Sequence, residues 1–185
     1  VDDNIIDGAI TSTLTVAVND GSSDNNFDAV ADQTVSAATT DNDVAGFTIV
    51  QSGGSTSVSE SGTTDTFTVV LNAQPASNVV LSISSSDSGE ATTTSLLTFT
   101  SGNWNTAQTV TVTGVNDNII DGTINSTLTL AIVDAITDDN FDSVADQTVS
   151  VATTDDDVAG FTIAQSGGST SVSESGSTDT FTVVL

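Results

Sequence analysis

Apolar and polar residues alternate in a series of short segments along the middle of this chain. Between residues 44 and 157 the alternation forms seven segments, separated by turns rich in Asp, Asn, Gly and Ser. The apolar positions are Phe47, Ile49 and Val58; Phe67, Val69 and Leu71; Val79, Leu81 and Ile83; Leu97 and Phe99; Val110 and Val112; Leu128, Leu130 and Ile132; and Val149 and Val151. A period of two is typical of strands with one buried face. The pattern predicts an all-β fold, an immunoglobulin-like β-sandwich of antiparallel strands.

A long internal repeat sets the domain organisation. Residues 1–71 return at residues 115–185 without a gap, and 15 of these 71 aligned positions differ. The period is therefore 114 residues, the size of a small domain rather than of one solenoid coil. We expect tandem sandwiches: residues 1–43 as the last two strands of one repeat, residues 44–157 as a complete repeat, and residues 158–185 as the first two strands of the next.

Composition narrows the functions open to such a chain. Its 185 residues include 25 Asp and Glu but no Lys, Arg, His, Cys, Met or Tyr, which gives a formal net charge of −25. Nucleic acids and anionic membrane surfaces would repel this charge, so neither is expected as a partner. Without His, Cys, Lys and Tyr, only carboxylates and hydroxyls remain as general bases and nucleophiles, and we do not expect an enzyme. No apolar stretch is long enough to insert into a membrane.

The carboxylates concentrate at one end of the predicted sandwich. If the strands run up and down, the turns after the first, third and fifth strands emerge together with the end of the seventh. These places carry Glu60 and Asp65; Asp87 and Glu90; Asp117 and Asp121; and Asp155, Asp156 and Asp157. Crowded carboxylates without a basic neighbour repel one another. Ca²⁺ relieves this repulsion through oxygen ligands, whereas Zn²⁺ and Cu²⁺ prefer His and Cys.

Three features allow more than one interpretation. The alternative to Ca²⁺ ligands is that the acidic turns are solvated β-turn formers. At the opposite end, the loop of residues 134–147 fits either a cation shared with the preceding repeat or a plain solvated loop. Its acids, grouped around Phe141, are Asp134, Asp138, Asp139, Asp142 and Asp146. Trp104, before the fifth strand, is expected to cap the core rather than to stack on a sugar.

The segments SVSESG, DTFTVVL, VLSISSSDSGEA and LTFTSGNWNTAQTVTVTGVNDN, followed by an Asp-rich boundary, resemble the Calx-β repeats of large bacterial surface and secreted proteins. The resemblance covers essentially the whole period and implies an immunoglobulin-like sandwich that binds Ca²⁺ at its distal loops and C-terminal acidic run. The implied ligands are Glu60, Asp87, Asp117, Asp121, Asp155 and Asp157, with copies at Asp3, Asp7, Asp41, Asp43 and Glu174. The turn with Asp117 and Asp121 carries Asp where the family usually has Glu, so the number and affinity of the ions stay open.

These features predict a structural role at the cell surface or in a secreted protein. We expect β-sandwiches stiffened by Ca²⁺ at their junctions, forming the shaft of a giant adhesin or a self-assembling extracellular fibre. The expected partners are neighbouring repeats and, in a fibre, identical chains; the sequence identifies no glycan or receptor. The alternative is a Ca²⁺-dependent carbohydrate- or protein-binding module. The junction at residues 41–46 has no Pro and no long Gly/Ser run, so we expect a short linker that bends when metal is removed.

Overall fold

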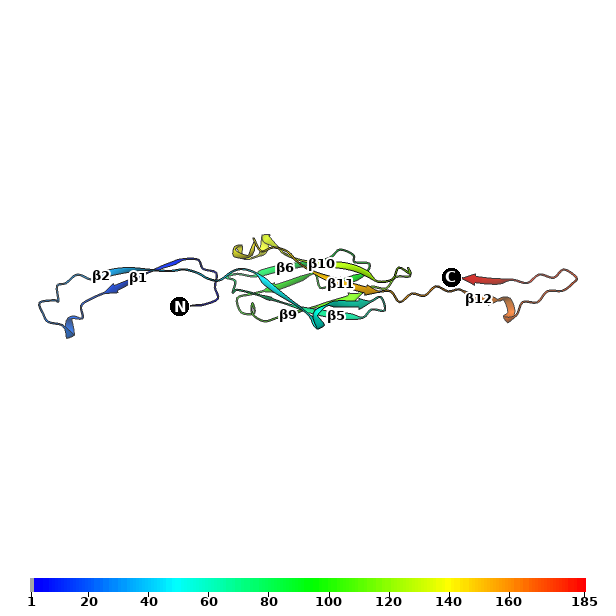
Figure 1. The fold of residues 1–185 in the computed structure, drawn as a ribbon, viewed down its shortest axis with the longest axis horizontal. Helices are drawn as coiled ribbons and strands as arrows, with labels where there is room; N and C mark the ends of the chain where they lie inside the picture. The colour runs from blue at the N-terminus through cyan, green and yellow to red at the C-terminus, as the bar shows by residue number, and fades with distance from the viewer. Residues whose placement is uncertain (1) are drawn as a thin grey trace.

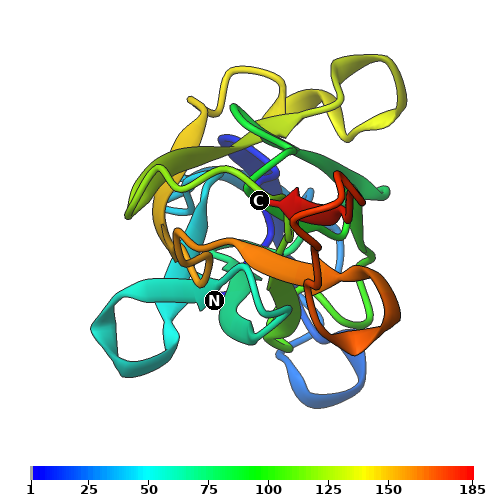
Figure 2. The ribbon, with the colours of Figure 1, turned by 90° about the vertical axis from the view of Figure 1, so that its right-hand side faces the viewer.

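A computed structural model describes residues 2–185 as an elongated molecule with one β-sandwich and two flanking hairpins (Figure 1). The hairpin β1–β2 (Ile10–Val16 and Gln33–Thr39) precedes the sandwich, and the hairpin β12–β13 (Thr162–Gln165 and Phe181–Val184) follows it. Viewed along the long axis, the two hairpins and the sandwich overlap, because they follow one another along that axis (Figure 2). Within residues 2–185 the helical elements are three-residue 3₁₀ turns, and none is long and apolar enough to span a membrane.

The sandwich consists of two sheets that enclose one core. Its strands are β3 (Phe47–Gln51), β4 (Thr56–Ser59), β5 (Thr64–Leu71), β6 (Val79–Ser85), β7 (Ala91–Thr93), β8 (Leu96–Phe99), β9 (Gln108–Gly114), β10 (Ile124–Ile132) and β11 (Gln147–Thr154). One sheet has the order β3-β5-β9-β7 and the other the order β4-β11-β10-β6-β8. Neighbouring strands are antiparallel, except that β4 and β11 pair in parallel. The predicted all-β, immunoglobulin-like sandwich is therefore confirmed.

The strands differ from the predicted ones in two places. The first strand breaks at a turn where Gly53 has a φ of 63°, a conformation that favours glycine. Its first half, β3, pairs with β5, and its second half, β4, pairs with β11. The predicted strand at Leu97 and Phe99 is β8, and the short strand β7 before it joins the opposite sheet. The alternation predicted the break near Gly53 but missed β7 and the change of sheet.

The core between the sheets is apolar and close to fully enclosed. Phe67, Phe99 and Phe141 are 1%, 0% and 0% exposed, and the inward positions of every predicted strand contribute to the same cluster. Trp104 is partly buried against this cluster, which agrees with the predicted role as a cap. Because the core fixes one sheet against the other, it also fixes the loops that emerge at each end of the sandwich.

Candidate metal centre

Four segments bring six carboxylates together at the end of the sandwich from which β11 leaves. Glu60 lies between β4 and β5, Glu90 between β6 and β7, Asp117 and Asp121 between β9 and β10, and Asp155 and Asp157 directly after β11. They form the groups Glu60–Asp155–Asp157 and Glu90–Asp117–Asp121. In each group, one carboxylate oxygen from every residue lies within 4.8 Å of the others. We call these six residues the exit cluster.

Two members of the exit cluster are glutamates inside the protein. Glu60 is 1% exposed and Glu90 is 6% exposed. Among residues 2–185, neither carboxylate oxygen of Glu60 has a hydrogen-bond partner, and the same holds for Oε2 of Glu90 and Oδ2 of Asp157. A buried carboxylate that receives no hydrogen bonds needs either a cation or a proton, because an unpaired charge in the interior is strongly unfavourable. The chain supplies no Lys, Arg or His for this purpose.

The pKa values of the buried acids reflect this shortage of positive charge. Burial, followed by the charges of Asp155, Asp117 and Asp121, raises the pKa of Glu60 to about 7. Burial and neighbouring aspartates also raise the pKa of Glu90 and the pKa of Asp157. Because acids from both groups act on Glu60, the exit cluster behaves as one concentrated region of negative charge.

Asp155 organises the loops of the exit cluster. Its Oδ2 accepts hydrogen bonds from the backbone N–H groups of Asp121 at 3.1 Å and Gly122 at 2.9 Å. Its Oδ1 accepts from the N–H of Asp157 at 2.7 Å. These donors favour the ionised carboxylate and lower the pKa of Asp155. Asp155 thereby ties the loop between β9 and β10 to the segment that leaves the sandwich.

The structure places Glu90, rather than Asp87, in the exit cluster. Asp87 was a predicted ligand, but it is exposed, and its Oδ1 accepts a hydrogen bond from the N–H of Gly89 at 2.9 Å. Its charge contributes to the raised pKa of Glu90. Glu90 was predicted only as an acid of the same turn, because the Calx-β resemblance implied Asp87 as its ligand. Asp65, predicted in the turn of Glu60, lies in β5 instead, and its Oδ2 accepts from the N–H of Ser57 in β4 at 2.9 Å.

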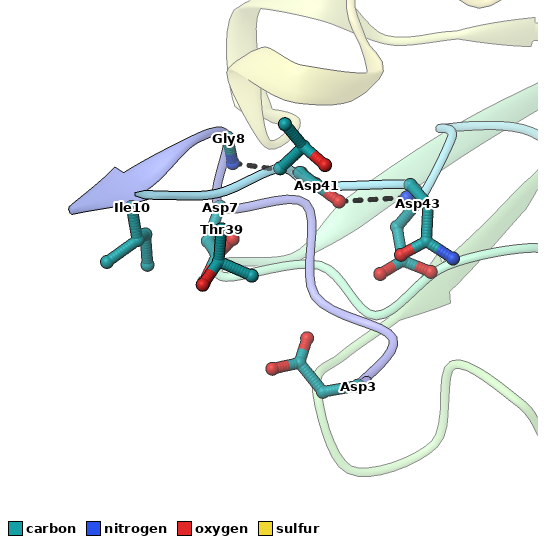
Figure 3. Close-up of a pocket in the computed structure, with 9 residues that line it drawn as sticks. Asp3, Asp7, Gly8, Ile10, Thr39, Asp41 and Asp43 are labelled. Atoms are coloured by element: carbon teal, nitrogen blue, oxygen red, sulfur yellow. Dashed lines mark hydrogen bonds between the residues drawn. The ribbon is translucent and has the colours of Figure 1, made fainter. Parts of the chain in front are cut away.

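The segments that carry Asp117, Asp121, Asp155 and Asp157 have copies one period earlier, before the sandwich. These copies hold four of the predicted ligands, Asp3, Asp7, Asp41 and Asp43. They line a cavity of about 160 Å³ (Figure 3). Asp41 accepts from the N–H of Gly8 and from that of Asp43, both at 2.8 Å, which repeats the pattern around Asp155. Burial and then the charge of Asp41 raise the pKa of Asp43. Glu174, the predicted copy of Glu60, is exposed in the segment between β12 and β13.

The acidic loop at the opposite end has a different organisation. Asp138 is 5% exposed, and its carboxylate accepts from the N–H groups of Ser77 at 2.8 Å and Asn140 at 3.1 Å. It therefore joins this loop to the turn after β5. Burial and the neighbouring Asp134 raise the pKa of Asp142. In the described part of the chain, the acids of this loop do not form a three-residue group like those of the exit cluster.

Comparisons with known proteins identify similar folds. The chain matches no protein-family model and none of the curated proteins. The apo-form Calx CBD1 domain is 15% identical, with a TM-score of 0.43, and the match covers 60% of this chain and 98% of that one. Domains 4 and 5 of the S-layer protein SbsC are 20% identical, with a TM-score of 0.45, over 78% of this chain and 57% of that one. CBD12 from CALX1.2 is 16% identical, with a TM-score of 0.40, and the match covers 62% of this chain and 48% of that one. These values describe a likeness of fold alone.

Proposed function

We propose that this chain is a structural segment of an extracellular protein, built from tandem β-sandwiches whose ends are stiffened by Ca²⁺. The observation that carries the proposal is the exit cluster, in which buried glutamate oxygens lack partners beside four aspartates. The proposed repeats comprise residues 1–43, 44–157 and 158–185. A structural role, rather than an enzymatic one, agrees with a chain that has no His, Lys, Cys or Tyr.

The donor set of the exit cluster fits Ca²⁺. Ca²⁺ binds oxygen ligands at about 2.3–2.6 Å, so two ligands of the same ion lie at most about 5 Å apart. The separation of up to 4.8 Å within each group meets this limit. Carboxylates are ligands that hard cations prefer, whereas Zn²⁺ and Cu²⁺ sites generally use His or Cys. The two groups fit two cations.

The residues of the exit cluster would convert metal binding into stiffness. Bound Ca²⁺ would supply the positive charge that the chain lacks. Glu60 and Glu90 would each hold one ion from inside the sandwich, while Asp157 would hold the ion of Glu60 from the segment that leaves the sandwich. Asp155 already connects that segment to the loop between β9 and β10. Without a cation, repulsion among six carboxylates favours separation of these loops.

An extracellular setting matches this type of site. Ca²⁺ sites of extracellular modules bind with dissociation constants of about 10⁻⁴–10⁻³ M. The formal charge of −25 also keeps neighbouring chains soluble and apart. These properties suit the shaft of a surface adhesin. A fibre of identical chains would need cations between the chains, because their negative charges repel one another. The elongated arrangement of sandwich and hairpins agrees with either form (Figure 1).

Isothermal titration calorimetry with Ca²⁺ tests the proposal on the full chain. Glu60→Gln should weaken binding by about tenfold or more, since it removes a buried charged ligand. Glu174→Gln is the matched control, because Glu174 has the same local sequence but is exposed. Equal affinities for the two variants, or no binding by the unaltered chain, would refute the metal centre.

A further inference from the structure

The turn that carries Asp3 and Asp7 also contacts the sandwich that follows it. The backbone N–H of Gln74, in the turn after β5, donates to the carbonyl oxygen of Asn4 at 2.7 Å. Ile5 and Gln74 form an isolated parallel β-bridge. The Nδ2 group of Asn140, in the loop after β10, donates to the carbonyl oxygen of Ile6 at 3.2 Å. Residues 4–6 are thus held by two loops of the next sandwich.

Ile6 adds an apolar contact to these hydrogen bonds. It is partly buried and packs against the core of the sandwich, whereas its neighbour Ile5 is 38% exposed. One period later, Ile119 and Ile120 are 61% and 57% exposed. The same Asn-Ile-Ile sequence is therefore engaged at one end of the sandwich and free at the other.

The free end is lined by copies of residues that lie beside the engaged turn. A cavity of about 410 Å³ lies beside Ile120, Val158, Ala159, Gly160 and Leu185. Their counterparts are Ile6, Val44, Ala45, Gly46 and Leu71. Ala45 is partly buried and Gly46 is buried, whereas Ala159 and Gly160 are exposed; the two valines are exposed in both places. The surroundings of Ile120 thus match those of Ile6 in sequence but not in burial.

We propose that Asn118–Ile120 is the docking surface for a second copy of the repeat, received by the turn after β5 and the loop after β10 of that copy. The partner is defined by the engaged end, where those two loops already hold Asn4 and Ile6. The docking surface lies between Asp117 and Asp121, two members of the exit cluster. One short segment therefore serves the metal centre with its ends and the neighbouring sandwich with its middle.

This arrangement couples the two binding events and rests on the proposed Ca²⁺ function. A cation held by Asp117 and Asp121 restricts the segment between them, so less freedom is lost when the next sandwich docks. By linkage, docking must raise the affinity of the exit cluster for Ca²⁺ by the same factor. Stiffness would then pass from one repeat to the next through this turn as well as through the linker.

Amide hydrogen exchange measured by NMR tests the docking in the full chain. Ile6→Ser should speed exchange at Gln74 about tenfold or more, while exchange at Asn72, which donates to Gly46 inside the sandwich, stays unchanged. Ile5→Ser is the matched control and should leave Gln74 protected. Asn140→Ala should speed exchange at Gln74 to a smaller extent. Unchanged exchange at Gln74 in Ile6→Ser, with Asn72 still protected, would overturn the docking.

A chain lengthened by one period tests the free surface and the coupling. Ile120→Ser should speed exchange at the amide equivalent to Gln74 in the added sandwich, and Ca²⁺ removal should do the same. If Ile120→Ser has this effect and chelation does not, the coupling is wrong while the docking stands. If calorimetry detects no Ca²⁺ binding but Gln74 remains protected, the metal function fails independently of the docking surface.

Discussion

The β1–β2 and β10–β11 hairpins are two closely similar copies of the repeat in different surroundings. Their register is the same: Leu14 lies opposite Val35, and Leu128 lies opposite Val149. Leu14 and Val35 are 56% and 55% exposed, whereas Leu128 and Val149 are 0% and 1% exposed. Pairing is therefore specified within the hairpin, while burial depends on strands from elsewhere in the repeat.

The acidic turns of the two copies also share their local hydrogen bonds and differ in their more distant neighbours. Asp41 and Asp155 bind equivalent backbone amides, and these bonds lower the pKa of both carboxylates. The pKa of Asp43 and the pKa of Asp157 are both raised, with burial as the largest cause. Within residues 2–185, buried glutamates from other loops join the turn at Asp155 alone. The turn is thus a local structure, whereas the buried cluster needs the whole sandwich.

The largest expected difference between the hairpins concerns their leucines. Leu128→Ala should lower the free energy of unfolding by about 2–5 kcal/mol, because it leaves a cavity in a closed core. Leu14→Ala should change it by less than about 0.5 kcal/mol, as is usual for exposed positions. Urea unfolding followed by the fluorescence of Trp104, the single tryptophan, measures both. Comparable losses in the two variants would show that the β1–β2 hairpin is buried in solution.

The second largest expected difference concerns the effect of Ca²⁺ removal on the two acidic turns. At a concentration 100 times the dissociation constant, each bound ion stabilises the folded state by about 2.7 kcal/mol. Adding EDTA should therefore lower the melting temperature of the sandwich by several degrees. Amide exchange in β1 and β2 should change less, since their turn has no glutamate partner in the described residues. A melting temperature that is the same with and without EDTA would contradict the assignment.

A smaller effect is expected from pH in the absence of metal. The pKa of Glu60 rises from 4.5 to about 7 on folding, so the folded protein holds a proton that the unfolded chain releases. This contribution to stability is complete below pH 4.5 and is lost as the pH rises through about 7. The melting temperature in EDTA should therefore fall over that range. Glu60→Gln should flatten the dependence and Glu174→Gln should not; identical profiles would contradict the burial of Glu60.

The sequence predicted those features that depend on neighbouring residues. Alternation located Phe67, Val69 and Leu71 on the buried face of β5, and the break of the first strand was visible at Gly53. The order of antiparallel strands also predicted that the loops of Glu60 and Asp117 would emerge at the same end. These predictions succeed because a period of two and a glycine turn are local properties of the chain.

The features that the sequence did not reveal depend on distant partners. β4 lies in the sheet opposite to that of β3, and β7 lies in the sheet opposite to that of β8. These pairings follow from side chains that fill the core, and the sequence does not specify them locally. Glu90 was predicted only as an acid of its turn, because its burial beside Asp117 and Asp121 depends on strands from elsewhere in the sandwich. The contact of Ile6 with the following sandwich also escaped prediction, because Ile5 and Ile6 are equivalent by composition and differ only in what lies beside them.

The parallel pairing of β4 with β11 determines how the sandwich responds to tension. The chain enters on the β3 side and leaves after β11 at the opposite end (Figure 1). A pull along the long axis loads β3 against β5 first, and it then drags β4 and β11 in opposite directions along their own length. This shear loads the rungs from Val151↔Thr56 to Thr154↔Ser59 together instead of opening them one after another. Because forced unfolding is governed by a rate, such a ladder delays rupture without requiring a large equilibrium stability.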